Sequence, residues 1–235
     1  MEINRQPTET AKRPVLYHIG FIALCLISVA IFLIIAEVIQ QSDEVAFDTV
    51  IRDIFVLESQ SFVYQLFKDI TWLGNKPGVI TMLVIMLVWL IWRYRDFKGI
   101  ILLITMVILQ NEFNKVLKDF YQRERPLIDP AIDALGYSFP SGHAMTGLLA
   151  YGLATYLIVV NVTSFKAKLF VGIFGSILIF LIGLSRIILS AHYPTDVIAG
   201  HALGIVTLII SIYLYQWMKK RNFSKKNDKD TLQVT

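Results

Sequence analysis

Six long runs of apolar residues constrain the fold of this chain more than any other feature. The predicted spans are Val15–Ala36, Gly78–Trp92, Gly99–Leu117, His143–Val162, Leu169–Leu189 and Thr195–Trp217. A helix needs about 20 apolar residues to cross the hydrocarbon core of a bilayer, and most of these runs are long enough. The composition agrees, since 55% of the residues are hydrophobic and only 17% are charged, fewer than in soluble domains. The sequence therefore predicts an all-α, polytopic membrane protein with six transmembrane helices.

Two of these runs need separate interpretation. Gly78–Trp92 is shorter than a full span, so either the helix begins earlier, through Pro77, or the bilayer is locally thinner. The first run follows a basic N-terminal segment, as the apolar core of a secretory signal peptide does. It is too long for such a core, and it ends in Glu37–Gln40 without a small-residue cleavage site. We therefore predict an uncleaved first transmembrane helix.

The positions of Lys and Arg predict the orientation of the helices. Basic residues gather in the N-terminal segment 1–14, in the links at 93–98 and 166–168, and after the sixth run at 219–229. With six alternating spans all of these segments fall on one side, and short basic loops favour the cytoplasm. Trp and Tyr residues at the same ends of the second and sixth runs are typical of an aromatic belt. We expect cytoplasmic termini in a plasma-membrane protein.

The remaining segments complete the domain organisation. We predict a cytoplasmic segment at 1–14, a six-helix domain at 15–217, and a basic, polar tail at 218–235 that is disordered. Between the first two spans, the alternation in Val45–Leu57 favours an amphipathic helix at the membrane interface. The net charge of +4 does not indicate a nucleic-acid partner, because the basic residues form short clusters between apolar runs. The single cysteine excludes an intrachain disulfide, and the sequence does not indicate an oligomeric state.

Three polar motifs lie beside the last four runs, on the predicted outer side. The first contains Lys118 and Arg125-Pro126, the second is Pro140–His143, and the third runs from Ser185 to Asp196. Lys118, Arg125 and Arg186 supply three cations, and fixed positive charge is what a phosphoryl group in transfer requires. Each arginine can bind two oxygens, whereas the lysine acts as a point charge. The alternative is that all three are interfacial anchors that reach towards water.

The second motif stands where the fourth span begins. Ser141 suits the N-cap of that helix, and Gly142 allows a ligand to approach the backbone closely. The free N–H groups and the helix dipole together favour an anion at this end. A capped helix start alone would explain the serine and the glycine, but not the adjacent His143.

The third motif contains a second histidine and a carboxylate. Pro194 suits the first position of the sixth helix, which places Asp196 in its first turn, within reach of His192. A carboxylate that accepts from Nδ1–H fixes the imidazole tautomer and leaves Nε2 as a nucleophile. The alternative is a helix-capping Asp196 beside an unrelated histidine. Outside the motifs, we expect Glu112 to pair with Lys115 in a structural role.

Together the three motifs resemble the signature of the type 2 phosphatidic-acid phosphatase superfamily, which also contains vanadium haloperoxidases and glucose-6-phosphatase. The bacterial membrane branch, with its phosphatidylglycerophosphatases and undecaprenyl-diphosphate phosphatases, is the most similar in size. The resemblance implies that His192 attacks phosphorus, Asp196 orients it, and His143 protonates the leaving oxygen and later activates water. It implies phosphate binding by the residues Lys118, Arg125, Ser141, Gly142 and Arg186, with no metal and no cofactor.

The expected function is therefore that of a metal-independent lipid phosphatase with a phosphohistidine intermediate, acting outside the cytoplasm. Its substrate could be undecaprenyl diphosphate, phosphatidylglycerophosphate or phosphatidic acid, because the motif residues bind the phosphate rather than the lipid. Two alternatives stay open, namely a phosphatase for a soluble phosphate ester and a non-enzymatic lipid-binding or lipid-transport protein. The intact set of His143, His192 and Asp196 weighs against the second alternative.

Overall fold

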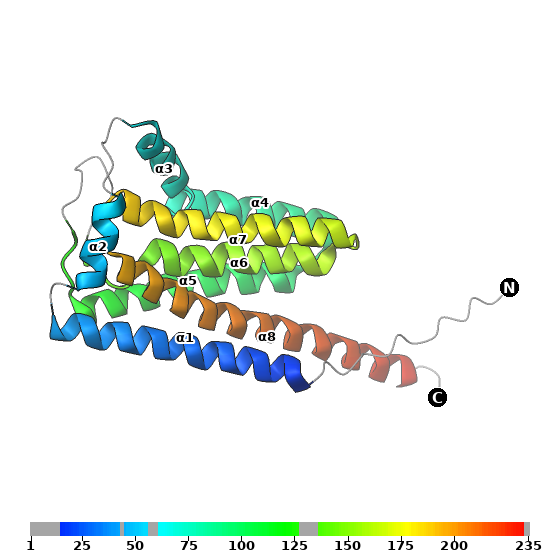
Figure 1. The fold of residues 1–235 in the computed structure, drawn as a ribbon. Coiled ribbons are helices and arrows are strands. Elements are labelled where there is room, and N and C mark those ends of the chain that lie inside the picture. Colours follow the sequence, from blue (N-terminus) through cyan, green and yellow to red (C-terminus); the bar gives the residue numbers. More distant parts are fainter. Residues whose placement is uncertain (1–14, 43–44, 56–60, 127–135, 233–235) are drawn as a thin grey trace.

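The computed structural model describes residues 15–42, 45–55, 61–126 and 136–232, with side chains described as far as residue 220. Within these residues all of the regular structure is helical (Figure 1). The elements in chain order are α1 (Val15–Gln41), α2 (Ala46–Phe55), α3 (Phe62–Trp72), α4 (Lys76–Tyr94), α5 (Phe97–Tyr121), α6 (Gly142–Asn161), α7 (Phe165–Ile188) and α8 (Pro194–Leu232).

Six of these helices are long and apolar enough to cross a membrane, and they confirm the six predicted spans. They are α1, α4, α5, α6, α7 and the part of α8 that ends at Lys220. The short second run gains length at its start, because α4 begins at Lys76 with a proline in its first turn and reaches 19 residues. Proline is favoured there because the first N–H groups of a helix have no partner within the helix.

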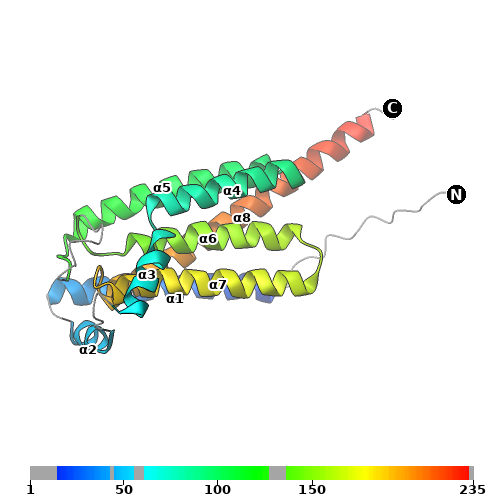
Figure 2. The same ribbon diagram turned by 90° about the horizontal axis from the view of Figure 1, so that it is seen from above.

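Helix α6 lies in the middle of the bundle, with α7 on one side and α5 on the other (Figures 1 and 2). Its closest neighbour is α8, and two glycines of α8 permit this approach. A Cβ atom added at Gly200 would lie 2.7 Å from the carbonyl oxygen of Ser141, and one at Gly204 would lie 3.0 Å from that of Met145. Small residues at helix contacts allow such close packing within membranes. The N-terminal ends of α6 and α8 are thereby held together.

The short helices α2 and α3 lie across one end of the bundle (Figure 1). Helix α2 confirms the amphipathic helix predicted after the first span, and its apolar residues Phe47, Val50 and Ile54 are exposed. The buried residue of α2 is a polar one, Asp48, which is only 2% exposed. The α2 face turned to the protein therefore carries charge, and its partners belong to the site described below.

The helix that contains the sixth predicted span is longer than that span. Helix α8 continues past Trp217 to Leu232, so the backbone of residues 218–232 is helical. This segment contains neither glycine nor proline, and its lysines and arginine are good helix formers. Helix α8 thus runs from the site end of the bundle to beyond the opposite end (Figure 1).

Candidate active site

The three motifs meet at the end of the bundle that α2 and α3 cover. They come from the C-terminal end of α5 and the segment after it, the N-terminus of α6, and the turn between α7 and α8. All three predicted cations lie within electrostatic range of both histidines. The fold therefore brings together every predicted site residue, namely Lys118, Arg125, Ser141, Gly142, His143, Arg186, His192 and Asp196.

His192 and Asp196 form a buried pair at the start of α8. The Nδ1 atom of His192 lies 3.4 Å from Oδ2 of Asp196, and the residues are 1% and 0% exposed. Ser138 completes a triangle, because its hydroxyl donates to Oδ2 of Asp196 and lies 3.3 Å from Nδ1 of His192. The backbone N–H of Tyr193 donates to the same carboxylate oxygen at 2.9 Å. We assign the Nδ1–H tautomer, which directs the imidazole proton towards the carboxylate.

The opposite ring nitrogen of His192 faces the cations. Its Nε2 atom lies 3.0 Å from Nη1 of Arg125. Burial, followed by the charges of Arg125, Arg186 and Lys118, holds the pKa of His192 well below its usual range. Neutral imidazole is therefore the form present at pH 7, and Nε2 carries a lone pair directed at the cationic pocket. This is the arrangement that a histidine nucleophile for an anionic group requires.

Backbone carbonyl groups hold two of the cations in place. Arg125 donates to the carbonyl oxygens of Ala191 and Gly136, both at 2.7 Å, and to that of Tyr137 at 3.2 Å. Lys118 donates to the same Tyr137 carbonyl at 2.8 Å, so one carbonyl binds both cations. These contacts with neutral carbonyl groups hold both cations beside His192.

The third cation, Arg186, is buried at the C-terminal end of α7. It is 1% exposed, and its Nη1 atom donates to the hydroxyl of Thr71 on α3 at 2.8 Å. Helix α3 therefore contributes to the site, although no motif points to it. A buried guanidinium of this kind needs an anion or well-placed acceptors.

The start of α6 confirms the predicted N-cap. The Ser141 hydroxyl accepts from the Ala144 N–H at 3.5 Å, and the Ser141 N–H donates to the Asp196 carbonyl oxygen at 3.0 Å. At Gly142 the close neighbour is a side chain of the protein, because an added Cβ atom would lie 2.9 Å from Oδ1 of Asn114. The glycine thus makes room for Asn114, which also donates to the Pro140 carbonyl oxygen at 3.1 Å.

The α3–α4 corner supplies a partner for His143 that the sequence analysis missed. The Nε2 atom of His143 lies 2.7 Å from Oδ1 of Asn75, so Nε2–H donates to the amide oxygen. Asn75 occupies the N-cap position of α4, yet its side chain makes no cap bond. The neighbouring Gly74 has no room for a side chain, because a Cβ atom there would lie 2.5 Å from Cδ2 of His143.

Two further polar residues near the His192–Asp196 pair, Asp48 and Arg123, were not predicted. Arg123 lies within the first motif, and its guanidinium is 2.7 Å from the carboxylates of both Asp196 and Asp48. In the sequence Arg123 appears only as one more basic residue between Lys118 and Arg125. The predicted Glu112–Lys115 pair is confirmed at 2.7 Å, and both of its side chains are exposed.

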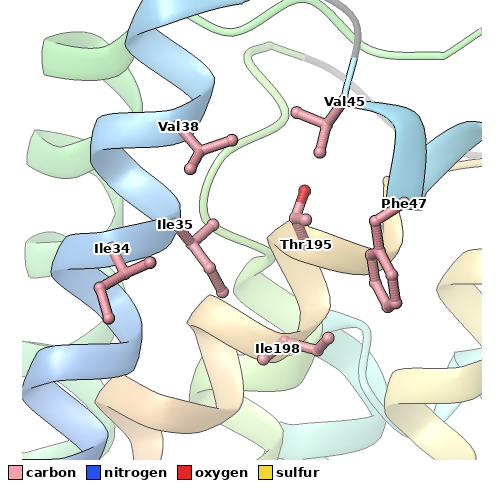
Figure 3. Close-up of a pocket in the computed structure, with 7 residues that line it drawn as sticks. All are labelled: Ile34, Ile35, Val38, Val45, Phe47, Thr195 and Ile198. Carbon is pink, nitrogen blue, oxygen red and sulfur yellow. The ribbon is translucent and has the colours of Figure 1, made fainter.

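An apolar cavity of about 260 Å³ lies beside the site, between α1, α2 and α8 (Figure 3). Its walls are the side chains of Ile34, Ile35, Val38, Val45, Phe47, Thr195 and Ile198. Thr195 precedes Asp196 in the chain, and its hydroxyl is bonded to Asp48 and Arg123.

A family model of the PAP2 superfamily matches residues 99–221, which hold all three motifs. The chain therefore belongs to the PAP2 superfamily, and it is a multi-pass membrane phosphatase. A curated relative is phosphatidylglycerophosphatase B of Bacillus subtilis, which is 29% identical over 180 residues, 76% of this chain and 88% of the relative.

Two solved structures share the fold. The crystal structure of the transmembrane PAP2-type phosphatidylglycerolphosphate phosphatase from Bacillus subtilis matches with a TM-score of 0.74 and 28% identity, covering 84% of this chain and 96% of that one. The crystal structure of LpxE from Aquifex aeolicus matches with a TM-score of 0.56 and 21% identity, covering 73% and 98%. The second likeness concerns the fold alone.

The contact between Asn75 and His143 leads to a prediction. If His143 is the acid for the leaving oxygen, we expect Asn75→Ala to lower kcat/KM on an alkyl phosphate about 10- to 100-fold, because a misplaced His143 would protonate that oxygen poorly. An aryl phosphate such as p-nitrophenyl phosphate needs less protonation, so its phosphorylation step should be affected much less. Asn111→Ala is the matched control, since the Asn111 side chain donates to the exposed Glu112 rather than to a residue of the site. Equal losses of kcat/KM, which reports the phosphorylation step alone, on both substrates would contradict this role of Asn75.

Proposed function

We propose that the chain hydrolyses the phosphate headgroup of a membrane lipid through a phosphohistidine formed at His192. The observation that carries this proposal is that the two ring nitrogens of His192 have different partners. Its Nδ1 lies against a buried carboxylate at 3.4 Å, and its Nε2 lies 3.0 Å from a guanidinium of the cationic pocket. The first contact supports the Nδ1–H tautomer, and the second supports binding of a phosphoryl group at Nε2.

The proposed reaction proceeds in two steps. In the first, Nε2 of His192 forms a bond to phosphorus while the bond from phosphorus to the lipid oxygen breaks, and His143 donates a proton to that oxygen. In the second, His143 takes a proton from water, whose oxygen displaces His192 and releases phosphate. Lys118, Arg125 and Arg186 stabilise the charge on the non-bridging oxygens in both steps.

The substrate that we propose first is phosphatidylglycerophosphate, because the curated relative from Bacillus subtilis is phosphatidylglycerophosphatase B. The contacts of the site concern the phosphate alone, so undecaprenyl diphosphate and phosphatidic acid stay as candidates. A phosphatase for a soluble ester would need its own pocket for the leaving group, whereas the cavity beside this site is apolar.

A phosphate-release assay in detergent tests this proposal. The purified chain should release phosphate from phosphatidylglycerophosphate faster than from undecaprenyl diphosphate, phosphatidic acid or glycerol 3-phosphate. Activity should persist in EDTA, since three fixed cations provide the charge that Mg²⁺ supplies in other phosphoryl-transfer sites. Fastest turnover of the soluble ester, or activity that needs added Mg²⁺, would contradict the proposal.

We further propose that the site faces away from the cytoplasm. The basic links after α4 and α6 and the C-terminal half of α8 lie at the end of the bundle opposite the site (Figure 1), and such links favour the cytoplasm. In Cys25→Ala protein, a cysteine at the exposed Gln41 should react with a membrane-impermeant thiol reagent in intact cells. A cysteine at the exposed Lys166 should react only after the cells are opened. The reverse labelling pattern would show the opposite orientation, with the site on the cytoplasmic side, and would contradict the proposal.

A further inference from the structure

Arg123 bridges two carboxylates, one of which lies beside Nδ1 of His192. Its Nη1 atom lies 2.7 Å from Oδ1 of Asp196, and its Nη2 atom lies 2.7 Å from Oδ2 of Asp48. The side chains of the three residues are 8%, 0% and 2% exposed. Water is therefore largely excluded from this set of charges, and each charge acts strongly on its neighbours.

Asp48 is held to the N-terminus of α8 as firmly as to Arg123. Its Oδ1 accepts from the Thr195 N–H at 2.8 Å, and its Oδ2 accepts from the Thr195 hydroxyl at 2.7 Å. Arg123 also donates to that hydroxyl, at 2.8 Å, and its guanidinium lies 4.1 Å from the centre of the Tyr193 ring. The positions of both charges relative to Asp196 are thus fixed by several contacts.

The net charge of Asp48, Arg123 and Asp196 together determines how this set acts on His192. An Arg123–Asp196 pair alone would have no net charge, and Arg123 would cancel much of the field that Asp196 exerts on His192. With Asp48 present, one cation is shared by two carboxylates, and the set has a net charge of −1 beside Nδ1 of His192. A histidine that accepts a phosphoryl group becomes cationic during the reaction, so a net negative charge at Nδ1 stabilises the transition state.

We propose that Asp48 is a positioning residue of the phosphoryl-transfer reaction, which neutralises Arg123 so that Asp196 keeps its charge for His192. This inference rests on the proposed function, in which His192 is the nucleophile. Asp48 belongs to α2 and lies outside the segment matched by the family model. The amphipathic helix therefore contributes a charge to the nucleophile, in addition to its apolar surface.

A simple clamp between α2 and α8 is the competing explanation, and charge variants separate the two. Asp48→Asn keeps the shape of the side chain but leaves the set neutral, so kcat should fall on the order of tenfold or more. The double variant Asp48→Asn/Arg123→Gln restores the net charge of −1 through Asp196 alone. We expect it to be faster than Asp48→Asn by several-fold. Both kcat values are expressed per folded molecule, and the folded fraction of each variant is measured by thermal unfolding in detergent.

The pH dependence of kcat/KM gives a second readout. His192 must be neutral to attack, so the acidic limb of the profile follows its pKa. In Asp48→Asn the uncompensated Arg123 disfavours the imidazolium form, and the limb should move to lower pH; the double variant should move it back. The other charged groups that act on His192 are unchanged in both variants, namely Lys118, Arg125, His143, Arg186 and Asp196.

Comparison with His192→Ala distinguishes a failure of the Asp48 proposal from a failure of the proposed function. If His192→Ala is inactive while Asp48→Asn has normal kcat and an unshifted acidic limb, Asp48 has no such role, although the proposed function stands. If the double variant is as slow as Asp48→Asn, or slower, Asp48 and Arg123 only hold α2 against α8, and the charge-sharing proposal is overturned. Activity in His192→Ala would overturn the proposed function itself.

Discussion

Replacing His192 with alanine should lower kcat on the order of 10⁴-fold or more, while the protein stays folded and inserted in the membrane. The reason is geometric, because His192 carries the ring nitrogen that is held 3.0 Å from Nη1 of Arg125, at the edge of the cationic pocket. No other described histidine has this setting, since His143 directs its Nε2 towards Asn75. Phosphate release per folded molecule is the measurement, with insertion checked in membrane fractions.

The matched control for this variant is His18→Ala. His18 lies near the start of α1, where its Nδ1 is 2.8 Å from the hydroxyl of Tyr213, far along α8 from Asp196. The same truncation there should leave kcat within a fewfold of the unaltered protein. Near-normal turnover in His192→Ala, with His18→Ala behaving in the same way, would rule out His192 as the nucleophile.

Asp196→Asn should have the second-largest effect, a loss of kcat of about 10³- to 10⁴-fold. The carboxylate accepts hydrogen bonds from Arg123, the Ser138 hydroxyl and the Tyr193 N–H, and it lies beside Nδ1 of His192. An amide group in its place would turn an NH₂ towards one of these donors. The imidazole would lose both its negative neighbour and the acceptor that selects its tautomer.

The measurement for Asp196→Asn is kcat together with the acidic limb of kcat/KM. The cationic pocket already holds the pKa of His192 well below its usual range. Loss of the carboxylate should lower this pKa further, so the acidic limb should move to lower pH even as the rate falls. A variant that is merely less stable, with unchanged kcat in the folded fraction and an unshifted limb, would contradict the assigned role.

Local chemistry explains why so much of the fold could be predicted from the sequence. Length and apolar composition are sufficient to identify membrane spans, and all six are present. Pro77 marked the start of α4 and Ser141 marked the N-cap of α6, because the preferences of proline and serine at helix starts depend only on neighbouring residues. The meeting of the motifs at one end followed from the alternation of six spans.

Contacts between distant segments explain what the sequence did not reveal. Asp48 binds Thr195 across 147 positions, and Asn75 binds His143 across 68. A hydrophobic pattern can predict that α2 is amphipathic, but it does not tell which polar side chain turns inwards. Arg123 presented the same difficulty, because its neighbours Lys118 and Arg125 are basic too, and only the fold directs one towards Asp196 and the other towards the pocket.

The central claim is that a covalent bond forms between phosphorus and His192. Rapid alkaline quenching of turnover with substrate labelled at the phosphate tests it directly, followed by mass spectrometry of the peptide around residue 192. We predict a phosphate group on His192 that is stable in alkali and lost in acid. The label should accumulate further in a His143→Gln variant assayed with an aryl phosphate, because hydrolysis of the intermediate then lacks its base. Continued turnover with no label on His192 in either protein would contradict the proposed mechanism.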